Sequence, residues 1–580
     1  MENWIKKFLE PSKKVIADKA KFPEETVREV EEKLKSADMK IYRGLIRIDK
    51  GRLGIPIYLS LYDVEGQKIT GKYKQMGKGV TEVLSQASAL MELVERFSLF
   101  SFYKEVPRTG ILSSFEELGE KAISFEIFLN SVKDEEPESV KKIAIQYLKK
   151  IPFYFVSAFE VETKKSKLIP FHWFWLLYEY NGSAGGNTYP EASVQAICEL
   201  IERHVNAVSI INNSLMPAIK RESIKGEAEK LLKCYEKLNI NLWIRDMTFG
   251  MPVPTVAIMA MDPSTYPKRS EIVYAAGTAT SPERAIIRAF TEVAQLAGDF
   301  DTEGKYVESG LPKFSTLEEA KNVIEYSHEI NLEDLPNLYS QDHVEELVNL
   351  AKKLKELNYE VYLIDITHPR LNIPAVYAII PGFLFRERTH ISYLYQMVRT
   401  LFLYLPKEKI KEIIEEIIKE IEDRYYLWAY LGNIYKELDK DLSAVSCYEK
   451  ALQCNPPEND KIAILSHLAD TYFRKGEYKK TLEIAERALE IGETSEIYNI
   501  IGRAYYKLGD YLKAMEAFSR AIDLNPASAI DYANIGYCLK AINYLGAAQI
   551  YFKKALELDP DLTMAKRGLE YCKAILNIEN

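Results

Sequence analysis

The pattern of hydrophobic and polar positions divides the chain into two parts. Up to about residue 405, runs rich in β-branched and aromatic residues alternate with helical periodicity. The runs predict strands over residues 53–64, 151–162, 241–249, 254–262 and 360–367. Apolar residues spaced by three and four predict helices over residues 24–37, 81–101, 189–211, 224–237, 281–298 and 342–357. Strands outnumber what a simple strand–helix alternation would give, so the pattern favours a mixed α+β domain of one or two similar halves.

The second part repeats itself. Gly502 and Gly536 lie 34 residues apart, as do Pro526 and Pro560. The copies are YLWAYLGNIYKELDKDLSAVSCYEKALQCNP, ILSHLADTYFRKGEYKKTLEIAERAL, IYNIIGRAYYKLGDYLKAMEAFSRAIDLNP and DYANIGYCLKAINYLGAAQIYFKKALELDP. Small residues at fixed offsets let paired helices approach closely, and stacking buries faces that one copy cannot bury alone. The segment resembles the tetratricopeptide repeat, which implies an all-α solenoid with a groove for a peptide or partner protein. A dimerisation or purely structural arm is the alternative.

These patterns set the expected domain boundaries. Residues 1–406 form the α+β domain, and the charged segment 407–424 is a helical connector. Residues 425–580 form about four repeats with a capping helix.

Composition narrows the functional class. The net charge of −9 argues against a general nucleic-acid binder. No apolar run reaches the ~20 residues of a membrane span, and the N-terminus has no secretory h-region. The 6 cysteines contain no CxxC pair, which predicts reduced thiols in a cytoplasmic protein. Abundant Lys, Glu and Ile with scarce Gln resemble hyperthermophile compositions.

Three of the predicted helices carry a stripe of polar side chains among apolar neighbours. The stretch MELVERF at 91–97 returns as CELIERH at 198–204, each with two glutamates three residues apart. On every helix the polar residues fall at i, i+4 and i+7, which is one narrow face. The three sets are Ser88, Glu92 and Glu95; Gln195, Glu199 and Glu202; and Arg288, Glu292 and Gln295. Glu191 extends the second stripe by one turn.

Carboxylates that converge in an apolar setting repel each other unless cations neutralise them. Oxygen ligands with few His or Cys select hard ions such as Mg²⁺, which commonly bridges to the phosphates of a nucleoside triphosphate. An exposed stripe of surface ion pairs is the alternative. Glu191 also has a rival role, because Thr188 and Glu191 have capping-box spacing. GKYKQMGKGV is excluded as a Walker A loop, since Gly79 follows Lys78 where Ser or Thr is required.

The segments GKGVTEVLSQASALMELVER, NGSAGGNTYPEASVQAICELIER and AAGTATSPERAIIRAFTEVAQ together resemble the YcaO family, over roughly residues 15–400. KAKFPEETVREVEEKL also resembles that family's N-terminal ATP-contacting helix. The resemblance implies binding of ATP and Mg²⁺ and activation of peptide backbone amides. It implies Mg²⁺ ligation by Glu92, Glu95, Glu191, Glu199, Glu202 and Glu292, and nucleotide contacts by Lys19, Thr26, Ala184, Asn187 and Arg288.

The resemblance also indicates which product the activated amide would give, an azoline or a thioamide. Azoline-forming members typically end in a proline-rich tail, whereas this chain continues past IPAVYAIIPGFLF into the repeats and ends LNIEN. The departure favours thioamidation by external sulfide and leaves no general base to name. Relatives in methanogenic archaea are associated with thioamidation of a glycine in methyl-coenzyme M reductase.

The alternatives are an azoline-forming cyclodehydratase, an enzyme acting on another amide such as one in a ribosomal protein, and a non-catalytic ATP-binding adaptor. The expected partners are a peptide or protein substrate, a sulfur-delivery or TfuA-type protein, a protein held by the repeats and a second copy in a homodimer.

Overall fold

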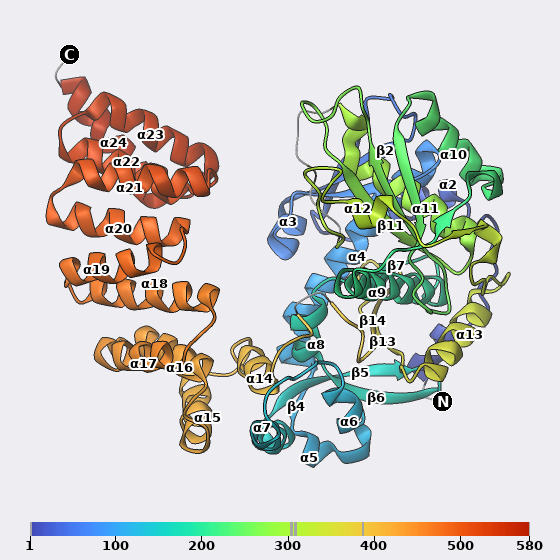
Figure 1. Cartoon of the computed structure of the whole chain (residues 1–580), viewed down its shortest axis with the longest axis horizontal. Coiled ribbons are helices and arrows are strands. Elements are labelled where there is room, and N and C mark those ends of the chain that lie inside the picture. Colours follow the sequence, from blue (N-terminus) through green and yellow to red (C-terminus); the bar gives the residue numbers. More distant parts are fainter. Residues whose placement is uncertain (1–2, 302–305, 307–309, 386–387, 579–580) are drawn as a thin grey trace. The chain divides into compact units, whose positions relative to one another are not determined.

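The computed structural model describes residues 3–301, 306, 310–385 and 388–578. The chain separates into two compact units, Met1–Thr400 and Leu401–Asn580 (Figure 1). Each unit has its own hydrophobic core. Among the described residues, no helix has both the length and the apolar character that a bilayer span requires.

The described residues of the first unit form three sheets. A three-stranded antiparallel sheet has the order β1-β2-β3, with β1 at Tyr42–Arg47, β2 at Ile57–Tyr62 and β3 at Lys74–Lys78. A second sheet has the order β11-β10-β9-β8-β12, with bounds Val273–Thr278, Thr255–Met261, Asn241–Asp246, Ala218–Ile219 and Glu329–Ile330. The third sheet has the order β4-β5-β13-β14-β7, with bounds Ile111–Ser113, Phe153–Glu160, Tyr362–Asp365, Ala375–Ile379 and Ser183–Gly185. Strand β6 (Lys165–Pro170) pairs with β5.

Three long helices pack on these sheets and organise the unit. Helix α4 (Glu82–Thr109) packs on β3 and β2, α11 (Pro282–Ala297) on β11 and β10, and α9 (Tyr189–Asn212) on β14. The remaining helices of eight residues or more in this unit are α2 (Pro23–Ser36), α7 (Glu138–Lys150), α8 (Phe171–Tyr178), α10 (Gly226–Lys237) and α13 (His343–Glu356), with α14 (Tyr393–Leu401) at its end.

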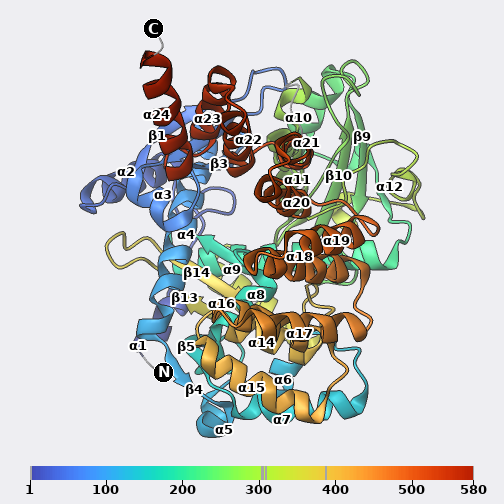
Figure 2. The same cartoon turned by 90° about the vertical axis from the view of Figure 1, so that its left-hand side faces the viewer.

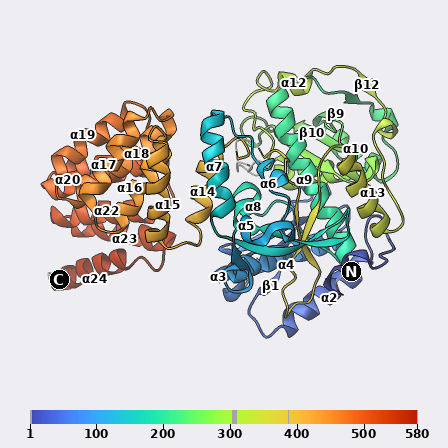
Figure 3. The same ribbon diagram turned by 90° about the horizontal axis from the view of Figure 1, so that it is seen from below.

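The predicted elements are confirmed, and the structure adds others. All five predicted strands and all six predicted helices exist, with ends that differ by a few residues; α4 extends to Thr109. The sequence pattern does not predict α8, because FHWFWLLY is almost wholly apolar and shows no helical periodicity. Helix α8 lies beside the short helices α5 (Phe115–Leu118) and α6 (Phe125–Leu129) (Figure 3). Its Trp173 packs against Phe128 of α6, which in turn packs against Phe115 of α5. Residues Lys74–Lys78 of the excluded Walker-like segment form a strand.

The second unit is a run of antiparallel helices stacked in chain order (Figure 2). Four pairs, α16–α17, α18–α19, α20–α21 and α22–α23, follow α15 (Lys407–Glu420) and precede α24 (Thr563–Ile578). The paired helices span Tyr425–Glu437, Asp441–Gln453, Glu458–Arg474, Tyr478–Leu489, Ser495–Leu508, Tyr511–Leu524, Ala529–Ala541 and Leu545–Leu558. A Cβ on Gly502 would lie 2.6 Å from the ring of Phe518, so the small residue is what allows the two helices to approach. The predicted solenoid fold is confirmed.

Candidate functional site

A cavity of about 400 Å³ in the first unit collects most of the sequence-predicted site residues. Its walls come from α2 and the segment before it, from β3 and β11, from β7 and the turn after it, and from α4, α9 and α11. The predicted site residues in the lining are Lys19, Thr26, Glu92, Glu95, Asn187, Glu191, Glu199, Glu202, Arg288 and Glu292.

In all three helices the same spacing between the N-cap and a glutamate brings that glutamate to the cavity. Each begins at a hydroxyl N-cap that accepts a hydrogen bond from the backbone N–H three residues later, and the caps are Thr81, Thr188 and Ser281. A glutamate follows each cap after eleven residues, at Glu92, Glu199 and Glu292. Eleven residues make about three turns, so the glutamate lies on the same side of each helix relative to its start.

Glycines fix the distance between the strands and two of these helices. A Cβ on Gly77 of β3 would lie 2.1 Å from the backbone nitrogen of Ala89 on α4. A Cβ on Gly277 of β11 would lie 2.4 Å from the backbone nitrogen of Ala289 on α11. Only glycine permits this approach, and the same strand–helix contact therefore occurs twice around the cavity.

The glutamates of α4 share one arginine. Arg96 forms an ion pair with Glu95, with Nη1 2.9 Å from Oε1, and its Nη2 lies 3.9 Å from Glu92 Oε1. Ser183 of β7 also donates to Glu95, at 2.6 Å. The Arg96 guanidinium also donates to the backbone oxygen of Tyr180 at 2.9 Å, so contacts from α4 and from the segment before β7 both hold it in place.

The other two helices show related pairings. Arg203 Nη2 lies 3.5 Å from Glu202 Oε1 and 3.9 Å from Glu199 Oε1. Glu199 Oε2 accepts from the backbone N–H of Gly182 at 3.2 Å. Glu292 forms an ion pair with Lys78, which projects from β3 across the cavity.

These pairings leave the carboxylates incompletely compensated. Burial raises the pKa of Glu95 to about 8; Arg96 opposes the shift, while Glu199 and Glu92 add to it. Burial likewise raises the pKa of Glu202, against the effect of Arg203. Burial also lowers the pKa of Lys78 to about 8, although Glu202 and Glu92 work in the other direction. A further cation in the cavity would lower the free energy of these carboxylates in their charged form.

Lys19 of the N-terminal segment and Arg288 of α11 supply a second, cationic side of the cavity. Lys19 lies 3.6 Å from Glu191 Oε1, and Arg288 donates to Asp18 at 2.9 Å and to the backbone oxygen of Thr278 at 2.9 Å. Burial works to raise the pKa of Asp18, but Lys19 and Arg288 outweigh it and hold that pKa well below its usual range.

Glu191 has only half of the capping-box geometry. Its backbone N–H donates to Thr188, but its carboxylate accepts from the backbone N–H of Ala20 at 3.1 Å and from the Asn187 amide at 3.2 Å. Thr26 of α2 donates to Asn187 Oδ1 at 2.9 Å. Glu191 therefore ties the N-terminal segment to the turn before α9.

Ala184 does not line the cavity. It lies in β7, 1% exposed, where it pairs with Val376 of β14. The lining also contains charged residues that sequence reasoning did not select: Asp18, Lys21, Lys78, Arg96, Arg203 and Arg284. A signal existed for three of them, since Arg96 and Arg203 directly follow the paired glutamates and Lys78 stands between two glycines in GKG.

The donor set is of the kind that hard divalent cations prefer, because it consists of carboxylate and other oxygen atoms. Among the described residues, no group of three or more His, Cys, Asp or Glu side chains converges on one point at ligand spacing. In this arrangement each carboxylate turns to an arginine, a lysine or a backbone N–H instead. Ligation by the six glutamates therefore stays a prediction.

Comparison with known proteins shows the families to which the two parts of the chain are similar. A family model described as YcaO cyclodehydratase, ATP- and Mg²⁺-binding, matches residues 76–384, and tetratricopeptide models match residues 425–457, 460–527 and 532–562. An uncharacterised protein of Methanothermobacter thermautotrophicus is 25% identical over 384 residues, which cover 62% of this chain and 93% of the relative. An uncharacterised protein of the tfuA 3′ region in Rhizobium leguminosarum bv. trifolii is 24% identical over 220 residues, which cover 35% of this chain and 51% of the relative.

A solved heterocyclase, in complex with substrate and cofactor, has the same fold as the first unit. The TM-score is 0.54 at 22% identity, and the match covers 68% of this chain and 57% of the heterocyclase chain. The family match spans more than half of the sequence and contains all three carboxylate helices. The chain belongs to the YcaO family of ATP- and Mg²⁺-binding proteins and carries C-terminal tetratricopeptide repeats.

Proposed function

We propose that the chain uses ATP and Mg²⁺ to activate a peptide backbone amide, and that sulfide then converts the activated amide to a thioamide. The observation that carries the proposal is the charge balance of the cavity. Its acidic side chains are Asp18, Glu92, Glu95, Glu191, Glu199, Glu202 and Glu292, and its basic ones are Lys19, Lys21, Lys78, Arg96, Arg203, Arg284 and Arg288. Seven acids and seven bases leave no formal net charge to attract either an anion or a cation alone.

A cavity without net charge favours the binding of ATP together with its cations over the binding of ATP alone. ATP with about four negative charges and two divalent cations adds no net charge, whereas ATP alone leaves the site strongly negative. In this proposal Glu92, Glu95, Glu191, Glu199, Glu202 and Glu292 hold Mg²⁺, which would screen the phosphates and stabilise charge on the transferring phosphoryl group.

The cationic side then has a defined role. Lys19 and Arg288 would donate to phosphate oxygens, with Arg288 kept in place by the backbone oxygen of Thr278. Thr26 and Asn187, which also line the cavity and bond to each other, would contact the nucleotide. The side chain of Ala184 is buried in β7, so a contact from that position would have to come from its backbone.

The reaction balances without another reactant. The amide oxygen attacks the γ-phosphorus and ADP leaves, which turns the oxygen into part of a phosphate leaving group. Hydrosulfide adds to the activated carbon, and phosphate departs with the amide oxygen and the hydrosulfide proton. The products are a thioamide, ADP and phosphate. If a neighbouring Cys, Ser or Thr side chain adds instead, the product is an azoline.

The continuation of the chain supports sulfide over an internal nucleophile. After β14, the residues that follow the family match form α14 and then the repeats. The family resemblance implies a proline-rich tail instead in the azoline-forming members. The repeat unit would hold the protein substrate or a sulfur-delivery protein. In this proposal the protein substrate is one modified at a glycine, such as methyl-coenzyme M reductase. The sulfur-delivery protein is a TfuA-type partner.

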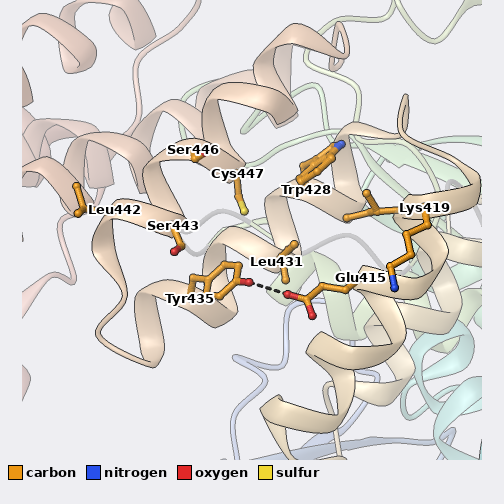
Figure 4. A pocket seen from close by; sticks show the side chains of 10 residues that line it. Glu415, Lys419, Trp428, Leu431, Tyr435, Leu442, Ser443, Ser446 and Cys447 are labelled. Carbon is orange, nitrogen blue, oxygen red and sulfur yellow. Dashed lines mark hydrogen bonds between the residues drawn. The ribbon is translucent and has the colours of Figure 1, made fainter.

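One place for such a partner is a hollow of about 610 Å³ within the second unit (Figure 4). Trp428, Leu431 and Ile418 supply its apolar lining, and Tyr435 donates to Glu415 at 2.6 Å. Pockets with an apolar lining and a few fixed polar groups are typical of ligand and peptide sites.

The experiment is to incubate the full chain with ATP, Mg²⁺, sulfide and glycine-containing peptides, and to follow ADP release and peptide mass. The proposal expects peptide-dependent ADP release and replacement of one oxygen by sulfur. Loss of one water would show azoline formation instead. ATP binding without turnover on any peptide or candidate protein substrate would favour the adaptor alternative.

A further inference from the structure

Helix α13 lies outside all the motifs discussed so far, yet it contacts the segment that carries Lys19. The link is a buried ion pair between Lys14 Nζ and Glu346 Oε1 at 2.5 Å, with both side chains 1% exposed. Burying two charges costs a large desolvation free energy, which is offset only when the ion pair has good geometry and further hydrogen bonds.

Three donors meet at one carboxylate oxygen of Glu346. The same Oε1 atom accepts from the Thr280 hydroxyl at 2.7 Å and from the backbone N–H of Ser340 at 3.1 Å. Thr280 directly precedes Ser281, the N-cap of α11. Glu346 therefore connects the N-terminal segment to the start of the helix that carries Arg288 and Glu292.

His343, one turn earlier on α13, holds the same segment at two points. Its Nδ1 lies 2.9 Å from the backbone oxygen of Ser12, and its Nε2 lies 3.0 Å from the backbone oxygen of Asp18. The Ser12 hydroxyl lies 2.6 Å from the hydroxyl of Thr188, the N-cap of α9. The network thus also reaches the start of the helix that carries Glu199 and Glu202.

We infer that Glu346 is a positioning residue for the cavity: through Lys14 and Thr280 it sets the N-terminal segment, and hence Lys19, in register with the carboxylate helices. The inference rests on the proposed nucleotide site. Glu346 does not line the main cavity but a small pocket that it shares with Lys19 and Arg288, so its action on a ligand in the main cavity is indirect.

The test compares Glu346→Gln with Asp262→Asn in the full chain. Asp262 is also a fully buried carboxylate with a cation partner, Arg52 at 2.5 Å, but it lies after β10 and outside the cavity lining. Glu346→Gln leaves the buried Lys14 ammonium without its counter-charge, and Asp262→Asn does the same to the guanidinium of Arg52, which is 25% exposed. Both substitutions should therefore lower the melting temperature. Only the first should loosen residues 12–21 and the cavity.

Two readouts decide the question. Hydrogen–deuterium exchange of residues 12–21 should be at least about tenfold faster in Glu346→Gln and unchanged in Asp262→Asn. The Kd for ATP with Mg²⁺, measured calorimetrically, should rise about tenfold in Glu346→Gln alone. In turnover, KM for ATP should rise while kcat at saturating ATP is retained, because the variant loses binding geometry and no reacting group.

A second variant covers the case in which Glu346→Gln does not fold. Lys14→Met with Glu346→Gln removes both charges, which should restore the melting temperature while residues 12–21 stay loosened. Wild-type exchange and ATP affinity in Glu346→Gln, or equal changes in Asp262→Asn, would overturn the inference. If the wild type binds no ATP, the proposed function fails, and the exchange comparison still decides the role of Glu346.

Discussion

Gly277→Ala tests whether the close contact between β11 and α11 sets the geometry of the cavity. The added Cβ would lie 2.4 Å from the Ala289 nitrogen, 2.5 Å from the Ala285 oxygen and 2.7 Å from the Arg288 Cβ. Ordinary contacts begin near 3.4 Å, so the helix must move away from the strand by about 1 Å. Two of the three obstacles are backbone atoms, which cannot turn aside as a flexible side chain can.

The magnitude follows from the packing. Ala285 and Ala289 are both 0% exposed, so the helix cannot shift without disturbing a filled core. Overpacking of this kind costs about 3 kcal/mol. For a unit of this size that corresponds to a fall of about 3–6 °C in the melting temperature. Because Arg288 and Glu292 move with α11, the affinity for ATP with Mg²⁺ should fall about tenfold or more.

The assay is scanning calorimetry of the full chain, together with ATP titration in the presence of Mg²⁺. Gly546→Ala in α23 is the matched control, since its Cβ would meet nothing within 4 Å. That substitution should leave ATP binding unchanged and stability unchanged or higher by up to about 1 kcal/mol. A Gly277→Ala protein that melts and binds ATP like the wild type would refute the reasoning.

Three further predictions concern separate parts of the molecule. Arg288→Met should weaken ATP binding about tenfold to a hundredfold in calorimetric titration, because a charge-assisted phosphate contact is lost; an unchanged Kd would remove Arg288 from the nucleotide site. Burial raises the pKa of Glu162 to about 7, so its contribution to stability is complete below about pH 4.5 and is lost as the pH rises through 7. Glu162→Gln should therefore stabilise the protein by about 1–2 kcal/mol above pH 7 and by less near pH 5, which thermal melts across that range will check. Asp470→Asn, which weakens contacts to Lys436 at 3.4 Å and Arg503 at 3.1 Å in the repeats, should lower stability by about 1 kcal/mol in the same melts and leave ATP affinity intact.

The fold was predictable where the periodicity was strong. The helices of the repeats and the three carboxylate helices show regular spacing, and their hydroxyl caps are visible in the sequence. Strand β11 was missed because VYAAGT is short and buried throughout, with no alternation to mark it. The arrangement of the strands into three sheets depends on pairings between distant segments, such as β7 with β14, which a single sequence does not encode locally.

The site was predictable as a set of helix faces but not as a network. The i, i+4, i+7 stripes predicted which glutamates share a side of each helix, and the cavity contains all of them. The sequence could not give the partners, because Lys78 reaches Glu292 across more than two hundred residues. The pair between Lys14 and Glu346 was missed for the same reason, since each looks like a solvated surface charge in its local sequence.

The most direct test of the central claim is calorimetric titration of ATP, with and without Mg²⁺, into the wild type and Glu199→Gln. The account predicts binding that requires Mg²⁺ and that the substitution weakens by at least about tenfold, because one carboxylate of the metal-binding set is neutralised. ATP binding that ignores Mg²⁺, or that Glu199→Gln leaves unchanged, would contradict the assignment of the carboxylate helices to a nucleotide–metal site.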